Sequence, residues 1–400
     1  MKHFEYQAVT KEGQRVKGVV EAKSEEKAAE VIRNKGMIVT KMSDQDDNFS
    51  FQIMSRFSRI RFAEMVMFTR QLATMINSGL PIITALNLIN KKVSVALKKV
   101  VNEIINQVEG GSSLYNSMVV FPDVFSDVYL ALVKSGEVAG ILDEVLDRLA
   151  DTMEKQHEFR QKVKGAMIYP IIVTFIMIIA AGIMVFFIIP QIADLYTQFE
   201  ADLPLFTEIV ISVSMFIKNQ WYIFALMFVG AIFGIMYFKK TDEGKKLFDE
   251  YILKVPLVGE LQHKIISTSV MNTLALLVKS GVSIVESLEI VAAGANNDVY
   301  RKGILNASVA VEKGMSISAA FSNEDVFPEM IIQMMSVGEE TGKLDDMLLR
   351  ISEQYRKDSE AALDAVTKAI EPVLMVFMGV GVFILVIAVI VPIFNLTAAF

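Results

Sequence analysis

The chain has no cysteine among its 400 residues, so disulfide bonds, thiolate nucleophiles and cysteine-ligated metal sites are all excluded. It has only three histidines, His3, His157 and His263, and they lie far apart in the sequence. None has a carboxylate at a spacing typical of a zinc site or a catalytic base, and no Ser-His-Asp arrangement or Gly-x-Ser-x-Gly elbow is visible. We therefore predict no catalytic residue, no metal site and no cofactor, and we expect that the protein is not an enzyme.

The chain also lacks a concentration of basic residues. Its net charge is −7, and nucleic-acid binding needs a basic face that neutralises phosphates, so we expect no nucleic-acid partner. With 53% hydrophobic residues the chain is too apolar for an ordinary soluble protein, yet 21% charged residues exclude a fully embedded one. The chain must therefore have some segments in lipid and others in water.

The most informative feature that is present is an internal repeat: the segment 68–190 returns as 270–392, shifted by 202 positions. The register slips by one residue where Gly111 faces Gly314, and it then recovers. The matched pairs are Leu72-Ala73 with Leu274-Ala275, Ser78-Gly79 with Ser280-Gly281, Leu86 with Leu288, Gly136-Glu137 with Gly338-Glu339, Pro170 with Pro372, and Pro190 with Pro392. We interpret the repeat as a duplicated unit, each copy being a soluble helical module with its own membrane anchor.

Three uncharged stretches are long enough to cross a hydrocarbon core, namely Ile168–Pro190, Asn219–Phe238 and Pro372–Phe394. We interpret the prolines that bracket the first and third stretches as markers of helix ends. Lysine and arginine residues are retained on the cytoplasmic side of a membrane. They gather before the first stretch, after the second and before the third, at Lys155, Arg160, Lys162, Lys164, Lys239, Lys240, Lys245, Lys246, Arg356, Lys357 and Lys368. This pattern predicts a cytoplasmic N-terminus, two cytoplasmic modules and an extracytoplasmic C-terminus.

The predicted fold class is mainly α: a polytopic membrane protein with duplicated cytoplasmic helical-bundle modules, three transmembrane helices and a small N-terminal ββαβ unit. In the ββαβ unit, strands are expected around Phe4–Ala8, Val16–Val20 and Met37–Thr40, with a helix from Ser24 to Gly36. The expected divisions are an N-terminal cytoplasmic unit 1–42, a linker 43–58, a first module 59–166, a span 167–190, a short extracytoplasmic loop 191–218, a span 219–238, a second module 239–370, a span 371–394 and an extracytoplasmic tail 395–400.

Short glycine-marked turns should join the helices of each module. In Ser78-Gly79-Leu80-Pro81 the glycine stops one helix and the proline starts the next. Ser283 replaces this proline in the second copy, which predicts a weaker start signal there.

The segment Gly338–Lys343 looks at first like a phosphate-binding loop. It has three residues rather than four between the glycines, and Leu344 follows the lysine where Ser or Thr is required. We interpret it as a helix–helix turn in which glycines supply backbone freedom. The alternative is a docking site or weak cation site, because a glutamate recurs beside the turn in both copies. The candidate partner-contact residues are Gly136, Glu137, Gly140, Gly338, Glu339 and Gly342.

The apolar stretches contain almost no ionisable residue, which argues against a proton-coupled transporter, a channel or an intramembrane protease. They do contain glycines that allow close approach of membrane helices. The candidate helix-packing residues are Gly230, Gly234, Gly379 and Gly381.

The sequence resembles the type II secretion F family along essentially its whole length. The residues that carry the resemblance are Phe68–Met75, Ser78–Pro81, Val337–Gly342, Leu344-Asp345, Phe4–Ala8 with Gly13 and Gly18, Tyr169-Pro170, Val185–Gln191, Asp202–Pro204 and Pro392–Phe394. The departures are Ser283 and the displaced Phe121-Pro122, which stands as Phe327-Pro328 in the second copy.

The resemblance implies an inner-membrane platform protein of a type IV pilus assembly machine that couples a cytoplasmic hexameric assembly or retraction ATPase to pilin insertion into, or extraction from, the filament. It also implies self-association into a homo-oligomer and contacts with other inner-membrane assembly proteins. Residues Ile331–Glu340 look closer to pilus versions of the family. The alternatives are a type II secretion platform acting on pseudopilins and, more remotely, a membrane transporter.

Overall fold

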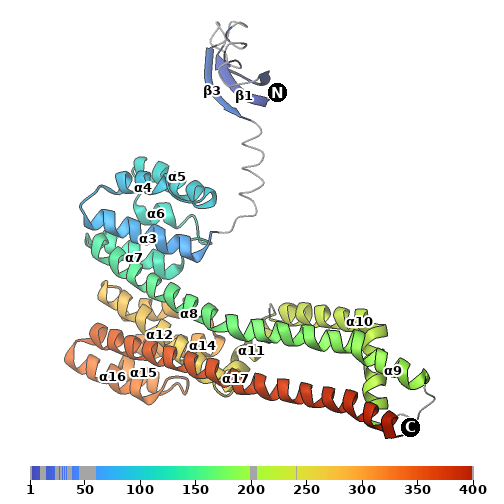
Figure 1. Ribbon diagram of the computed structural model, residues 1–400. Helices are drawn as coiled ribbons and strands as arrows, with labels where there is room; N and C mark the ends of the chain where they lie inside the picture. The colour runs from blue at the N-terminus through green and yellow to red at the C-terminus, as the bar shows by residue number, and fades with distance from the viewer. Residues whose placement is uncertain are drawn as a thin grey trace. The chain divides into compact units, whose positions relative to one another are not determined.

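The computed structural model describes residues 2–9, 15–22, 27, 29, 31, 33, 38–44, 60–198, 205–239 and 241–398 (Figure 1). The chain forms two compact units, and each is treated by itself below. The first unit contains the residues up to 125 together with 142–150, and the second contains 126–141 together with the residues from 151 onward.

The N-terminal part of the first unit is an antiparallel sheet of strand order β2-β1-β3. Its strands are β1 (Lys2–Val9), β2 (Arg15–Ala22) and β3 (Ile38–Asp44). The last strand extends into the expected linker, because Ser43 and Asp44 still pair with β1. Of the helix expected between Ser24 and Gly36, the described residues 27, 29, 31 and 33 are helical, and the others lie outside the described part.

The rest of the first unit consists mainly of α3 (Phe62–Asn77), α4 (Ile82–Asn90), α5 (Val95–Glu109), α6 (Leu114–Met118) and the first turns of α8 (Leu142–Ile183). The apolar residues recur every three or four positions, so each helix presents one apolar stripe to a shared core. Phe68 is tilted against Phe125 with ring centroids 6.3 Å apart. At the edge of the core, Arg70 donates to Asp147 at 2.8 Å.

The second unit contains α7 (Asp127–Ala139), the rest of α8, and all later helices. The helices of its soluble part are α11 (Asp242–Lys254), α12 (Val258–Lys279), α13 (Ile284–Gly294), α14 (Asp298–Glu312), α15 (Ile317–Ser322), α16 (Glu329–Thr341) and α17 (Leu344–Ala398). Tyr300 and Phe321 are fully buried among them, and the Phe327 ring contacts both.

The turns repeat at the positions that the sequence comparison of the copies predicts. Among the described residues, six glycines adopt positive φ, three in each copy and matched in order: Gly79, Gly111, Gly140, Gly281, Gly314 and Gly342. An L residue with a side chain rarely adopts this conformation, so glycine is required at these helix ends. Gly111 and Gly314 are 203 positions apart, whereas the members of the other two pairs are 202 apart. The one-residue slip in register therefore falls at this pair of equivalent turns.

The prediction of a weaker helix start at Ser283 is wrong. Ser283 is the N-cap of α13, and its hydroxyl accepts a hydrogen bond from the Glu286 N–H at 3.3 Å. Pro81 is the N-cap of α4 and makes no side-chain hydrogen bond. The two copies therefore start the same helix by different means, since serine satisfies a free amide whereas proline only fixes φ.

In the described part of the chain, two helical runs are long and apolar enough to cross a membrane, Leu142–Asp194 and Leu344–Ile384. The first comprises α8 (Leu142–Ile183), the π-helix η1 (Met184–Ile188) and the start of α9 (Ile189–Gln198). In α10 (Leu205–Phe238), two apolar helical pieces meet at a bend of 43° and would make a third span if they act as one.

Two predictions for this region are wrong. The prolines are not helix ends: Pro170 lies inside α8, Pro190 inside α9, and both Pro372 and Pro392 inside α17. The stretch 191–218 is not a loop either, because α9 continues to Gln198 and α10 begins at Leu205. Apolar residues at helical spacing explain this second difference, since Ile211 and Val210 of α10 pack on α9.

The π-helix η1 explains how Pro190 is accommodated. The Ile189 N–H bonds to the Met184 carbonyl, five residues earlier, so the next carbonyl, that of Val185, would pair with residue 190. Proline has no N–H to donate. The hydroxyl of Ser214 on α10, which is 2% exposed, donates to the Val185 carbonyl at 2.9 Å instead. A side chain from a neighbouring helix thus satisfies the carbonyl that proline leaves free.

Candidate interaction site

The turn between α16 and α17 carries the second copy of the glycine–glutamate motif. Gly342 ends α16 in the left-handed conformation, with φ of 66°. Gly338 lies one turn earlier, where α17 comes close: a Cβ there would stand 2.9 Å from the Met347 Cβ and 3.0 Å from the Leu344 Cα. The two glycines therefore have different roles, because one allows a backbone conformation and the other allows two helices to approach.

Glu339 points into its own module. Its carboxylate accepts hydrogen bonds from the Ile317 N–H at 3.0 Å, the Ser318 N–H at 3.3 Å and the Ser318 hydroxyl at 2.8 Å. These are the first amides of α15, where a helix has donors without partners and a positive dipole end. Ser316, the N-cap, serves a different amide, that of Ala319. The Glu339 side chain is thus committed to holding α15 against α16.

In the first copy, the equivalent turn follows α7. Gly140 ends α7 in the left-handed conformation, with φ of 72°, and Gly136 is buried like its counterpart. Glu137 is half-buried, and Val138 beside it is 84% exposed. Glu340 is exposed at the corresponding place in the second copy. Val138 and Glu340, one position after each glutamate of the motif, therefore both face outward.

The four candidate packing glycines face open space. A Cβ added at Gly230, Gly234, Gly379 or Gly381 would meet no atom within 4 Å in the part of the chain that the structure describes. Large apolar side chains around them are exposed as well, among them Phe228, Phe233, Phe377 and Phe383. Such a surface suits lipid or another membrane helix, and within the described residues it is not covered by the chain itself.

Sequence reasoning treated Lys155 and Lys162 only as signals of membrane orientation. In the structure, the Nζ of Lys155 lies 3.8 Å from Glu353, and the Nζ of Lys162 lies 2.7 Å from Glu360. The lysines on α8 and the glutamates on α17 are each seven residues apart, so two parallel helix faces meet. This equal spacing is the signal in the sequence that could have predicted the pairing.

A partly buried polar network lies between α12 and α14 of the second unit. The Tyr300 hydroxyl lies 2.9 Å from the His263 Nδ1 and 3.2 Å from the Ser267 hydroxyl. Burial lowers the pKa of His263 and raises the pKa of Tyr300 to about 12, since both groups lose the water that stabilises their charged forms. Both are therefore neutral at pH 7. The network joins α12 to α14.

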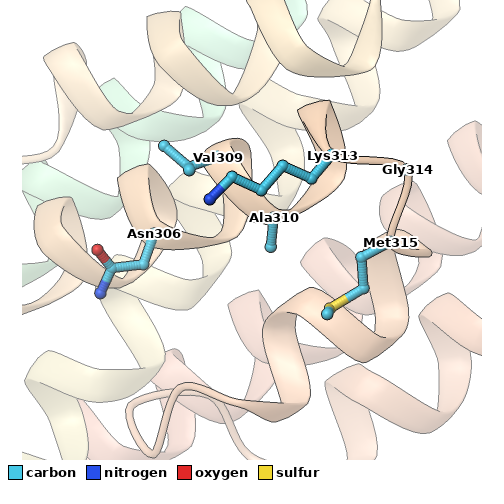
Figure 2. A pocket seen from close by; sticks show the side chains of 6 residues that line it. All are labelled: Asn306, Val309, Ala310, Lys313, Gly314 and Met315. Carbon is cyan, nitrogen blue, oxygen red and sulfur yellow. The ribbon is translucent and has the colours of Figure 1, made fainter.

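A shallow hollow of about 480 Å³ lies where α14 ends (Figure 2). Asn306, Val309, Ala310 and Lys313 line it from one helix, and Met315 follows the turn at Gly314. Lys313 is the one titratable lining residue, so no acid–base pair is available there. Among the described residues, no group of three or more histidine, aspartate or glutamate side chains is placed to hold a metal ion.

Comparison with known families matches the duplication. The model described as "Type II secretion system (T2SS), protein F" matches residues 68–190 and again 270–392, the limits of the repeat. The model described as "Type II secretion system protein F, N-terminal domain" matches residues 1–43.

Curated relatives match along the whole chain. The type IV pilus assembly protein PilC of Thermus thermophilus is 31% identical over 98% of this chain and 98% of its own. The type IV pilus assembly protein TapC of Aeromonas hydrophila is 32% identical over 98% of this chain and 95% of its own. The type II secretion system protein F of Pseudomonas aeruginosa is 30% identical over 99% of both chains.

The fold and these surfaces define a class: a helical membrane protein in which two copies of one module each continue into a long apolar helix. The chain belongs to the type II secretion system protein F family, as its family matches and full-length relatives show. The predicted resemblance and the predicted limits of the repeat are confirmed.

Proposed function

We propose that this protein is the inner-membrane platform of a type IV pilus assembly machine. The observation that carries the proposal is the full-length similarity to proteins named for pilus assembly, at 31% and 32% identity. Its role would be to couple a cytoplasmic hexameric ATPase to the insertion of pilins into the filament or to their extraction from it. The similarity to a type II secretion protein F, at 30% identity, supports the second candidate, a secretion platform acting on pseudopilins.

The proposed topology has both modules in the cytoplasm, three spans, and the C-terminus outside. The basic residues beside the apolar helices support it, because lysine and arginine are retained on the cytoplasmic side. The bent helix α10 would then be the second span, returning the chain to the cytoplasm before α11. The platform would be a homo-oligomer that also contacts other inner-membrane assembly proteins.

The proposed mechanism is mechanical. The chain has no phosphate-binding loop of its own, so the ATPase would move the modules from outside. The helix α17 runs unbroken from the second module into the apolar segment, so a tilt of its soluble end would reach the membrane end. We propose that the two glycine turns contact the ATPase through their outward-facing residues Val138 and Glu340, with Glu137 and Glu339 supporting the turns from within.

The test of this function is deletion of the gene, followed by measurement of sheared surface filaments, membrane pilin and exported proteins in the same cells. Loss of pili with pilin retained in the membrane is the expected result. Intact pili with trapped exported proteins would instead establish the secretion platform. No change in either would contradict both assignments.

A further inference from the structure

The two copies of the repeat contact each other through different faces. The first side of this contact consists of α7 and the part of α8 from residue 151, which belong to the first copy in sequence, and its second side consists of α12, α13 and α17. Contacts between described residues of the two copies include Val128 with Gly294, where an added Cβ would lie 3.6 Å from the Val128 Cγ2, and the Ser135 hydroxyl with the Ser280 carbonyl. They also include Thr152 with Asn272 at 3.2 Å and the two lysine–glutamate pairs of α8 and α17. Different faces of the two copies therefore meet.

Within the described residues, a contact between different faces leaves one face of each kind without a partner in the same chain, whereas a twofold contact uses the same face twice. On the second copy, the unused counterpart of the α7 face lies on α16. Met330 and Val337, which correspond to Val128 and Ser135, are 42% and 52% exposed. Like their counterparts they are seven residues apart, so they share one face of the helix. The α16 face is thus an exposed apolar surface on a helix equivalent to α7, whose own face is covered by the second copy.

On the first copy, the unused counterpart of the α12–α13 face lies on α3 and α4. Ser78 corresponds to Ser280 and is exposed at the end of α3. Leu88 on α4 is 40% exposed, whereas its counterpart Ile290 on α13 is half-buried. The residues that would receive α16 are therefore open to solvent on α3 and α4.

We infer that a second copy of this chain docks with its α3–α4 face on the α16 face, so that the contact inside one chain is repeated between chains. The inference rests on the proposed topology, in which both copies approach the membrane from the same side. In that topology the membrane requires the apolar helices of both chains to lie in one plane. Repetition of this operator builds a ring if the rotation closes.

Two charged pairs would lie beside the contact between chains, and one of them is attractive while the other is repulsive. Lys357 corresponds to Lys155, and Asp151 of the second chain corresponds to Glu353, so this pair again joins opposite charges. Asp364 corresponds to Lys162, however, and would meet Glu158, a like charge. The contact between chains is therefore weaker near the membrane than the contact within a chain, and a single substitution can correct it.

The absence of cysteine makes thiol cross-linking of the full-length protein in membranes the direct test. The variant Val337→Cys with Ser78→Cys should give dimers and higher multiples with a short bifunctional thiol reagent. The matched pair Ser135→Cys with Ser280→Cys should cross-link only within one chain. Chains carrying one cysteine each, mixed in one membrane, should give a dimer only when Val337→Cys meets Ser78→Cys. Multiples absent from the first pair while the matched pair reacts fully would overturn the inference, and so would self-linking of the single Val337→Cys variant.

Charge variants separate this docking from random collision. Lys357→Glu should lower the yield of multiples roughly two- to fivefold, and Asp364→Lys should raise it by a similar factor. Lys313→Glu, the same change on the exposed residue that follows α14, should leave the yield unchanged. Equal yields in all three would contradict the inference. Cross-linking needs no filament, so its failure is distinguishable from failure of the proposed pilus function, which the gene deletion tests separately.

Discussion

Removal of the Glu339 carboxylate should release the N-terminal turn of α15. In Glu339→Ala, two backbone amides and one hydroxyl lose an ionised acceptor, and burial shields Ile317, which is 1% exposed, from solvent that could replace it. Hydrogen bonds to charged groups are worth about 1.5–3 kcal/mol, and a helix N-terminus adds some tenths. We therefore expect local opening of α15 to become easier by about 2–3 kcal/mol. Since about 1.36 kcal/mol is tenfold, the amides of residues 317 and 318 should exchange roughly 30- to 150-fold faster.

The assay is hydrogen exchange by mass spectrometry on the full chain in lipid nanodiscs, followed in peptides that cover α15. Glu340→Ala is the matched control, because Glu340 is exposed and the hydrogen bond recorded for it comes from the Ser336 hydroxyl at 3.3 Å. A surface change of this kind costs within about 0.5 kcal/mol, or roughly twofold in exchange. Glu339→Gln should fall between the two, since it keeps an acceptor without the charge. Equal exchange in Glu339→Ala and Glu340→Ala would refute the capping role.

Three further predictions concern other parts of the second unit. Ser214→Ala should cost about 1–3 kcal/mol by leaving the Val185 carbonyl unpaired, and much less in a Pro190→Ala background, where residue 190 regains an N–H; strictly additive losses of thermal stability in a double-mutant cycle would contradict this. Gly338→Ala should cost about 1–3 kcal/mol in denaturant unfolding through overlap with α17, and an unchanged midpoint would argue against the close approach. Burial lowers the pKa of His263, so its contribution to stability is present above its ordinary pKa of 6.5 and is lost as pH falls through the lowered value; His263→Gln should flatten the loss of thermal stability between about pH 7 and 5, and identical pH profiles would exclude this origin.

Sequence reasoning succeeded where a residue type has few alternatives. A glycine that ends a helix with positive φ has no good substitute, so Gly79 and Gly281, or Gly140 and Gly342, stay in register through the duplication. The apolar stretches were predictable for a similar reason, because a helix that crosses a membrane needs a long run of uncharged, apolar residues. The strands of the N-terminal sheet follow from alternation of apolar and polar residues, as in Phe4–Ala8.

It failed where a neighbouring element decides the outcome. Pro190 reads as a helix end when only its own chain segment is considered, but Ser214, 24 positions later, supplies the hydrogen bond that lets the helix continue. Glu339 lies beside a turn and could be read as exposed, yet the start of α15 occupies its carboxylate. Neither partner is recognisable from local sequence, since both contacts depend on how helices pack.

The second unit contains one long unbroken helix and one bent helix. Between Leu344 and Ala398 the helix α17 has no interruption, and its Pro372 sits where the soluble part becomes apolar. The helix α10, in contrast, departs from helical geometry at Gln220, with φ of −119° and ψ of 22°. A long unbroken helix transmits tilt, whereas a bent one absorbs it. In the proposed machine, the apolar helices that continue a module would therefore carry the motion, and α10 would let the second module move relative to the first.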